Sequence, residues 1–199
     1  MVFRGDPPAI RRAALNPLLR ACYAVPVAAC KSLTFMPTLL TLEKRGDIVR
    51  LDADLGPRQQ AFRRLFVAPT VAQWLQRDLG GRDTSVIGNA LSPLEQIDSL
   101  FERFVSGRAL DHGRQFKCLR PAEKAVWELK TDDVRIFGFF TERDCFVALF
   151  ANFTDTVKDY GLYRGYVDEV VRVRTALAID GGHVEGSDPD DVVSIAAAS

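Results

Sequence analysis

Few residues of this chain have the types and the spacing that catalysis requires. The adjacent carboxylates Asp132 and Asp133 could act as a pair, but their position between two apolar segments is more typical of a turn. His112 follows Asp111 in a glycine-flanked loop, and a single loop histidine is more often exposed to solvent than catalytic. Arg135 lies inside an apolar stretch, where a long charged side chain either reaches water at a sheet edge or is placed for a function.

The sequence carries no motif of the common nucleotide-binding or hydrolytic sites. It contains neither of the glycine-rich phosphate-binding patterns, no H-E-x-x-H zinc motif and no G-x-S-x-G nucleophile elbow. Its four cysteines include no C-x-x-C pair and its two histidines are far apart, so a structural metal site is not expected. We therefore predict a site that uses no metal and no small-molecule cofactor.

Composition and charge predict a globular protein without a membrane span. The 199 residues are 47% hydrophobic and 26% charged, and the formal net charge of zero gives no argument for a nucleic-acid partner. No stretch approaches the roughly 18 uninterrupted apolar residues of a span. Val27-Ala-Ala-Cys30 looks like a lipoprotein cleavage box, but Asn16, Pro17 and Arg20 interrupt the apolar region before it. We predict a cytoplasmic protein with free thiols.

The ends of the chain differ in charge from its body. Residues 1–32 form a proline-containing basic arm, which we expect to be poorly ordered. Residues 180–199 form an acidic tail, which we expect to be disordered. Residues 33–179 are predicted to form a single domain.

Helices are predicted to precede the sheet in this domain. Residues 33–42 and 48–51 are a candidate hairpin, and helices are expected from Pro57, over 70–79 and over 83–90. Leu65 and Phe66 would lie on the buried face of the first helix, and Thr70 would cap the second. The clearest signal is the capping box Ser92-Pro-Leu-Glu95, followed by apolar residues at helical spacing until Gly107.

The sheet is predicted from the residues that follow. A short strand is expected around 115–119, and further strands over 126–130, 134–140 and 144–150. After a polar exit at 152–158, apolar spacing predicts a helix from about 160 to 179. The predicted fold is α+β, with N-terminal helices packed on a small antiparallel sheet that is followed by a C-terminal helix.

This order of elements and the motifs within it resemble the RelE/ParE toxin superfamily, most closely its HigB and phage-type branch. The best matches are Trp127-Glu-Leu-Lys130 and Val134-Arg-Ile-Phe137, followed by the apolar strand Phe146-Val-Ala-Leu-Phe150. Val71-Ala-Gln-Trp-Leu75 resembles the start of the family's first helix, and the whole resemblance covers about residues 70–178. It implies the toxin of a type II toxin–antitoxin pair, a ribosome-dependent mRNA endoribonuclease that a cognate antitoxin covers.

The resemblance also implies roles for particular residues. RNA cleavage by attack of a 2′-hydroxyl requires a proton acceptor, cations beside the scissile phosphate and a proton donor for the leaving oxygen. Arg135 matches the strand arginine that binds phosphate, and Lys130 matches the basic end of the W-E-L-R motif. Lys158 would supply a further cation, and Tyr160 or Tyr163 would transfer a proton.

Two features leave alternatives open. Where the family has an F-x-K-K segment, this chain has Phe153-Thr-Asp-Thr-Val-Lys158, with an acid and two hydroxyls in place of the paired lysines. Arg135 could instead form a structural ion pair across the sheet, with Asp133, Glu128 or Asp144 as its partner. The alternatives are a catalytically inactive protein of this fold that binds a protein partner, and an α+β protein outside the family.

Overall fold

The computed structural model describes residues 36–196, except 57–58, 83, 86–87 and 89. These residues belong to one compact unit within Ser32–Ser199. The predicted basic arm, residues 1–32, lies outside the described residues. None of the helices described is both long and apolar enough to cross a membrane.

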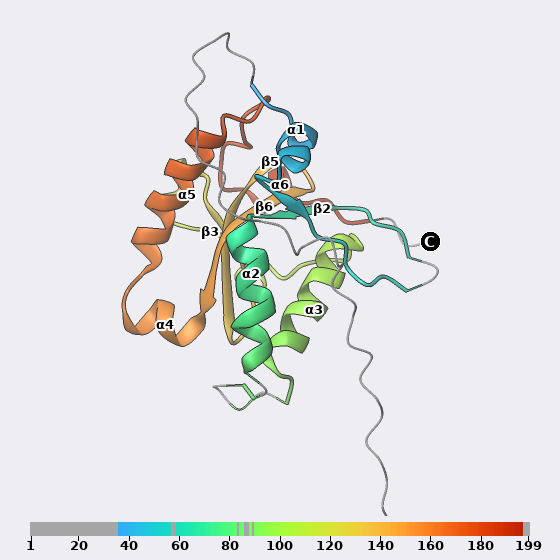
Figure 1. Ribbon diagram of the computed structural model, residues 1–199, viewed down its shortest axis with the longest axis vertical. Coiled ribbons are helices and arrows are strands. Elements are labelled where there is room, and N and C mark those ends of the chain that lie inside the picture. The colour runs from blue at the N-terminus through green and yellow to red at the C-terminus, as the bar shows by residue number, and fades with distance from the viewer. Residues whose placement is uncertain (1–35, 57–58, 83, 86–87, 89, 197–199) are drawn as a thin grey trace, which may run out of the picture. The chain divides into compact units, whose positions relative to one another are not determined.

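A mixed sheet of six strands runs through the centre of the described unit (Figure 1). The strands are β1 (Val49–Arg50), β2 (Arg64–Val67), β3 (Phe116–Cys118), β4 (Trp127–Lys130), β5 (Val134–Glu142) and β6 (Cys145–Phe153). Their spatial order is β1-β2-β6-β5-β4-β3. β2 and β6 are parallel, and the other neighbouring strands are antiparallel.

Helices cover both faces of this sheet (Figure 1). One face carries α2 (Pro69–Arg77), α3 (Pro93–Val105) and the short α6 (Pro189–Val192). The other face carries α1 (Leu39–Arg45), α4 (Thr154–Asp159) and α5 (Tyr163–Leu177). The 3-10 turns η2 (Leu79–Gly81) and η3 (Ala122–Lys124) lie in the connections between described elements.

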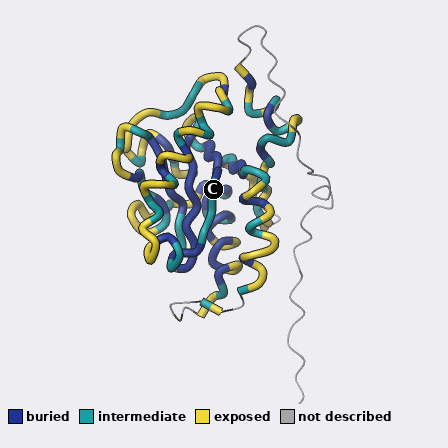
Figure 2. The backbone as a smooth tube through the Cα atoms, turned by 60° about the vertical axis from the view of Figure 1, so that its left-hand side comes forward, coloured by how far each residue is buried: buried dark blue, intermediate teal, exposed yellow. Residues whose placement is uncertain are grey.

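The strand residues alternate between two apolar cores, because successive side chains of a strand point to opposite faces. Ile136 and Phe140 of β5 pack with the α2–α3 face, whereas Phe137 and Phe139 pack with the α5 face. Most of β5 is therefore buried from both sides (Figure 2). A strand buried on both faces shows an almost continuous apolar run, and this run is what the sequence presents at 134–140.

The predicted arrangement of the fold is wrong. The sheet is mixed and larger than expected, and the helices alternate with strands along the chain instead of preceding a small antiparallel sheet. The main error falls at Leu65 and Phe66, which form part of β2 rather than the buried stripe of a helix. β2 pairs with β6 and is buried on both faces, and a short apolar run of this kind has no periodicity that separates a strand from a helix.

The predicted hairpin near residue 42 is also wrong. The chain forms α1 there, with Thr38 as the N-cap, whose Oγ1 accepts a hydrogen bond from Thr41 N. Gly46 has φ of 76° and ends this helix in the left-handed conformation. A glycine that permits positive φ serves a helix C-cap as well as a hairpin turn, so the glycine alone did not separate the two.

Several elements are confirmed. Ser92 and Glu95 form both bonds of the capping box at the start of α3. Strands occur over 127–130, 134–142 and 145–153, and α5 lies within the predicted C-terminal helix. Helix α2 begins at Pro69 with Ala68 as its N-cap, so Thr70 is inside the helix rather than its cap. The helix predicted over 83–90 includes positions outside the described residues.

The acidic segment 180–196 is docked on the rest of the unit, where disorder was expected. Val192 of α6 is buried in the core of the α2–α3 face, and Val184 N donates a hydrogen bond to Phe140 O. The acidic composition does not reveal these contacts. The attachment is made by the backbone and by the apolar side chains of Val184, Val192 and Val193, which pack against the core.

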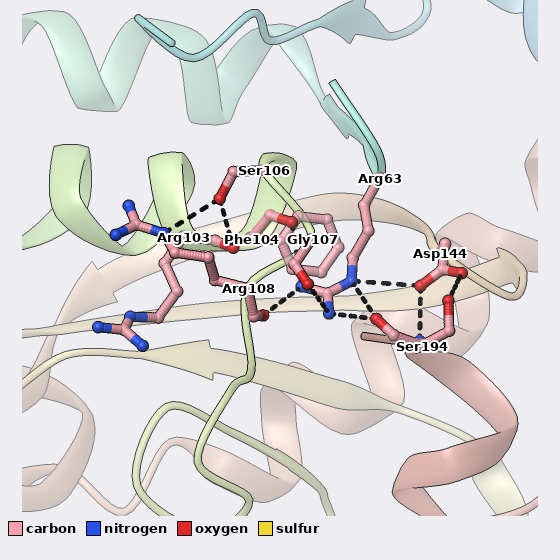
Figure 3. A network of polar contacts seen from close by, with 8 residues as sticks. All are labelled: Arg63, Arg103, Phe104, Ser106, Gly107, Arg108, Asp144 and Ser194. Atoms are coloured by element: carbon pink, nitrogen blue, oxygen red, sulfur yellow. Dashed lines mark hydrogen bonds and ion pairs between the residues drawn. The ribbon is translucent and has the colours of Figure 1, made fainter. Parts of the chain in front are cut away.

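A buried arginine holds the end of this segment (Figure 3). Arg63 immediately precedes β2, and its guanidinium donates hydrogen bonds to the carbonyl oxygens of Phe104, Gly107, Arg108 and Ser194. Its Nε lies 3.2 Å from Asp144 Oδ1 in the β5–β6 turn, and the Ser194 hydroxyl donates to the other carboxylate oxygen. We call Arg63, Asp144 and Ser194 with these carbonyls the Arg63 network; it joins β2, the end of α3, the β5–β6 turn and the C-terminal segment.

Candidate functional site

Polar side chains gather on the α5 face of the sheet, where β4 ends and β5 begins. They come from three neighbouring strands and from the first turn of α5. We call this group the Arg135 cluster; its members are Lys117, Glu128, Lys130, Arg135 and Tyr163. Three of the five residues, Arg135, Lys130 and Tyr163, are site residues that the sequence predicted.

The register of the sheet brings the strand residues together. Lys117 is directly opposite Glu128, and Lys130 is directly opposite Arg135. Residues opposite each other across antiparallel strands point to the same face of the sheet, and their Cβ atoms are roughly 5 Å apart. Arg135 is also opposite Asn152 of β6, whose side-chain amide donates a 2.9 Å hydrogen bond to Tyr166 OH.

Aromatic packing fixes the helix that supplies Tyr163. Phe137 follows Arg135 by two residues and therefore lies on the same face of β5. Its ring stacks on Tyr166 with a centroid distance of 4.3 Å and meets Tyr163 edge to face at 6.0 Å. Tyr163 and Tyr166 are three residues apart in α5, so both face the sheet, and Tyr163 OH is held beside the guanidinium.

Arg135 is bound by neutral acceptors only. Its side chain donates hydrogen bonds to Tyr163 OH at 3.3 Å, to Val134 O at 2.9 Å and to Thr131 O. It makes no ion pair within the part of the chain that the structure describes, and no described residue accepts a hydrogen bond from its Nη2.

The three carboxylates considered as partners of Arg135 are engaged elsewhere. Asp144 belongs to the Arg63 network, and Glu128 pairs with the two lysines of the cluster. Asp133 accepts a 2.6 Å hydrogen bond from the Gln96 amide and lies in the turn between β4 and β5, as a turn residue should. The ion pair considered for Arg135 is thus absent from the described residues.

Glu128 is the only carboxylate of the Arg135 cluster, and its side chain is completely buried. Its Oε1 lies 3.3 Å from Lys117 Nζ and 3.7 Å from Lys130 Nζ, but neither Oε1 nor Oε2 has a hydrogen-bond partner among the described residues. Burying a carboxylate with an unfilled acceptor opposes folding, and such groups in native proteins often have a function.

The cluster contains three cations and one carboxylate, and the excess positive charge affects Lys130. Burial lowers the pKa of the Lys130 ammonium, the nearby carboxylate of Glu128 raises it, and the cations Lys117 and Arg135 lower it further, with a net decrease. A lysine with a lowered pKa is more readily neutral and can accept a proton. The Arg135 cluster therefore combines a candidate proton acceptor, a hydroxyl and two further cations, which together suit an anionic substrate.

The remaining predicted site residues lie outside this cluster. Lys158 is exposed on α4, and Tyr160 follows that helix with 76% of its surface exposed. Within the described residues, no hydrogen bond, ion pair or cation–π contact joins either side chain to the Arg135 cluster. His112 is exposed in its loop and packs edge to face on Phe116.

Sequence reasoning missed Lys117 and the central place of Glu128. Lys117 occupies a short strand whose register with β4 has no local signature, so nothing in the sequence connects it with residue 128. The spacing of Tyr163 and Tyr166 was an available signal, since two tyrosines three apart on a helix mark one polar stripe of an otherwise packed face.

The described residues contain no group of three or more histidine, cysteine, aspartate or glutamate side chains placed to hold a metal ion. Cys118 and Cys145 are free thiols, and burial raises the pKa of both. Cys22 and Cys30 lie outside the described residues.

Compared with known proteins, the chain matches no family model, no curated protein and no solved structure. Membership of the RelE/ParE superfamily therefore stays a prediction from the motifs of β4, β5 and β6.

Proposed function

We propose that this protein is a metal-independent RNA endonuclease and the toxin of a toxin–antitoxin pair, acting on mRNA at the ribosome in the cytoplasm. One observation carries the proposal. Arg135 and Lys130, which the resemblance selects from separate motifs, meet in one cluster together with Lys117 and with Tyr163, one of the two tyrosines considered for proton transfer. A cognate antitoxin that covers this cluster would keep the nuclease inactive.

The reaction makes specific demands on these side chains. The 2′-oxygen attacks the phosphorus, the bond from phosphorus to the 5′-oxygen breaks, and the products are a 2′,3′-cyclic phosphate and a 5′-hydroxyl. One proton leaves the 2′-hydroxyl and one proton must reach the 5′-oxygen, while negative charge builds on the phosphate oxygens. In this proposal Arg135 and Lys117 stabilise that charge, Lys130 accepts the proton, and Tyr163 OH donates one to the leaving oxygen.

The hydrogen bonds of Arg135 support its role. Nε and Nη1 are held by Tyr163 OH and by two carbonyl oxygens, so the guanidinium is fixed in one orientation. The donors of Nη2 remain for a phosphate oxygen, and a fixed donor aimed at developing charge stabilises a transition state without reorganisation. The absence of a carboxylate partner keeps the full charge of Arg135 available for substrate.

A second function is favoured by a different observation. Arg135 is only 7% exposed, and Lys158, which replaces the family's paired lysines, forms no hydrogen bond or ion pair with the cluster within the described residues. A protein with this arrangement could bind a protein partner without cleaving RNA.

Expression in bacteria tests the first function against the second. Induced wild-type protein should arrest growth, and Arg135→Ala should relieve the arrest. Arg143→Ala is the matched control, because Arg143 is an exposed arginine in the turn at the other end of β5. Absence of arrest by the wild type contradicts the toxin assignment, and arrest that persists in a folded Arg135→Ala variant supports the binding function.

Cleavage in vitro tests the chemistry. Wild-type protein added to programmed ribosomes should leave 2′,3′-cyclic phosphate ends in the presence of EDTA, and a 2′-deoxynucleotide at the cleaved position should block the reaction. Arg135→Ala should reduce the rate roughly 10²- to 10³-fold, the loss typical of removing one donor to developing charge. Cleavage of the 2′-deoxy substrate would exclude attack by the 2′-hydroxyl.

A further inference from the structure

The Arg135 cluster contains an amine whose surroundings activate it as a nucleophile. The side chain of Lys130 is 14% exposed, so its ammonium has lost most of its contact with water but is still reached from solvent. Glu128 Oε1 lies 3.7 Å from Lys130 Nζ and has no hydrogen-bond partner among the described residues. Lys117 and Arg135 supply two further cations from the neighbouring strands β3 and β5. A lysine that is desolvated or lies beside another cation is activated for attack on carbonyl groups.

The charges around Lys130 act in the direction that such an attack requires. Burial is the largest cause and lowers the pKa of the ammonium, Glu128 raises it, and Lys117 and Arg135 lower it further. The net pKa is below the ordinary value, so a larger fraction of this amine is neutral at neutral pH than of a lysine in water. The neutral amine carries the lone pair that attacks a carbonyl carbon.

The same neighbours favour a carbonyl compound that carries a negative charge. Arg135 makes no ion pair with a described residue, and none of these residues accepts a hydrogen bond from its Nη2. The side chain of Lys117 is 39% exposed, and its Nζ lies 5.8 Å from the centre of the Tyr163 ring. A phosphate or carboxylate group on the ligand can therefore form charge-assisted hydrogen bonds here, which an uncharged aldehyde cannot.

We propose that Lys130 captures small carbonyl compounds that carry a phosphate or carboxylate group, binding them as an imine while Arg135 and Lys117 hold the anionic group. The Nζ lone pair attacks the carbonyl carbon, and the carbonyl oxygen takes up a proton to give a carbinolamine. In all, the nitrogen loses two protons and the oxygen gains two, so one water leaves as the C=N bond forms, without oxidation or reduction. This inference goes beyond RNA cleavage and does not depend on it.

Reductive labelling of the wild-type chain tests the inference. The probe is pyridoxal 5′-phosphate, an aldehyde with a phosphate group, followed by borohydride, which reduces the C=N bond to a stable amine. Mass spectrometry of the peptides should find the label on Lys130 before any other lysine. Pyridoxal, the same aldehyde without the phosphate, is the matched probe and should label Lys130 roughly tenfold more slowly, the effect of losing one hydrogen bond between charged groups.

Variants separate the parts of the site. Arg135→Met should slow labelling by pyridoxal 5′-phosphate more than labelling by pyridoxal, because it removes a contact that only the phosphate makes. Glu128→Gln should move the rise of the labelling rate with pH to lower pH, because the carboxylate of Glu128 raises the pKa of Lys130. Lys44→Met is the control, since Lys44 is exposed in the last turn of α1, and it should leave both rates unchanged.

The outcomes against the inference are equally specific. A label that appears first on Lys117, or on exposed lysines such as Lys44, contradicts Lys130 as the capture site. Equal rates for the two aldehydes contradict the role of the two neighbouring cations. Because the peptides of the wild-type chain give both results, a variant that fails to fold does not prevent a decision. Failure of labelling leaves the nuclease proposal standing, since cleavage of RNA is measured separately.

Discussion

Two buried arginines at opposite ends of the sheet have opposite surroundings. Arg63 is 1% exposed and Arg135 is 7% exposed, so both guanidinium groups have lost almost all contact with water. Arg63 faces Asp144, four carbonyl oxygens and the ring of Phe104 at 5.5 Å. Arg135 faces two carbonyl oxygens and one hydroxyl, and it has no carboxylate among its described neighbours.

These surroundings indicate that Arg63 stabilises the fold, whereas Arg135 has the surroundings expected in a functional site. The acceptors of Arg63 come from α3, the β5–β6 turn and the C-terminal segment, and the ion pair compensates the charge that burial isolates. Arg135 instead lies near Lys130, a like charge whose pKa it helps to lower. Two like charges held close together oppose folding, and such pairs are expected at sites where function requires them.

Replacing each of the two arginines by methionine tests the difference between them most directly. Arg63→Met removes the charge partner of Asp144 and leaves several carbonyls without donors, so the free energy of unfolding should fall by about 3–5 kcal/mol. Arg135→Met removes hydrogen bonds but no ion pair, so the loss should be about 1 kcal/mol. Urea denaturation of both variants at neutral pH measures these differences.

The exposed Arg143 supplies the control for this pair. Arg143→Met should change the free energy of unfolding by no more than about 0.5 kcal/mol. If Arg135→Met destabilises the protein as much as Arg63→Met does, Arg135 is a structural residue and the contrast between the two arginines disappears.

Glu128→Gln tests the role of charge in the Arg135 cluster, because it removes the cluster's carboxylate and leaves the Arg63 network unchanged. Because the carboxylate of Glu128 raises the pKa of Lys130, its loss should lower that pKa further. If Lys130 is the proton acceptor, the acid limb of the pH–rate profile for RNA cleavage should move to lower pH. The loss of a buried partner of two lysines should also lower the free energy of unfolding by about 1–3 kcal/mol.

Glu142→Gln is the matched change outside the cluster. Glu142 is exposed at the end of β5 and pairs with Arg64 on the surface, so this variant should keep both the pH profile and, within about 1 kcal/mol, the stability of the wild type. An unchanged acid limb in Glu128→Gln would remove Lys130 from the role of proton acceptor.

The same contrast explains how far the sequence could predict the molecule. The capping box at Ser92 and the apolar strands of β5 and β6 are local signals, and they were predicted correctly. Arg135 and Lys130 were selected by motif, and the strand register then placed them opposite each other. Tyr163 was one of two tyrosines considered, without a firm motif match, and it reaches Arg135 from α5. The sequence had no way to show Lys117 beside Glu128, because cross-strand register is a property of the assembled sheet.

The Arg63 network was beyond prediction for a physical reason. Four of the acceptors of Arg63 are backbone carbonyls, which any residue type provides, and they lie 41 to 131 residues away in the chain. β2 was missed for a related reason, since its identity as a strand depends on pairing with the distant β6. The acidic segment 180–196 looked disordered because its attachment depends on Arg63, Asp144 and the pocket of Val192.

His183 provides the smallest and most specific test of that docked segment. Burial lowers the pKa of its imidazole, Arg174 of α5 lowers it further, and Glu185 raises it, with a net decrease. An imidazole in the unfolded chain titrates near pH 6.5, so below about that pH the unfolded state binds more protons than the folded state. The free energy of unfolding should therefore decrease as the pH falls through about 6.5, and His183 should contribute nothing to this slope well above it.

His183→Gln should reduce the loss of stability between about pH 8 and about pH 5.5, as measured by urea denaturation at both values. This change in stability should be smaller than those expected for the substitutions of Arg63 and Glu128, because the imidazole is only partly buried and solvent screens the neighbouring charges. Arg174→Gln should reduce the same slope in part, since it removes one of the two causes of the lowered pKa. If His183→Gln and the wild type lose stability equally, the acidic segment does not hold His183 against α5. The segment would then be attached only through the Arg63 network and α6, at the end of the sheet where Arg63 lies.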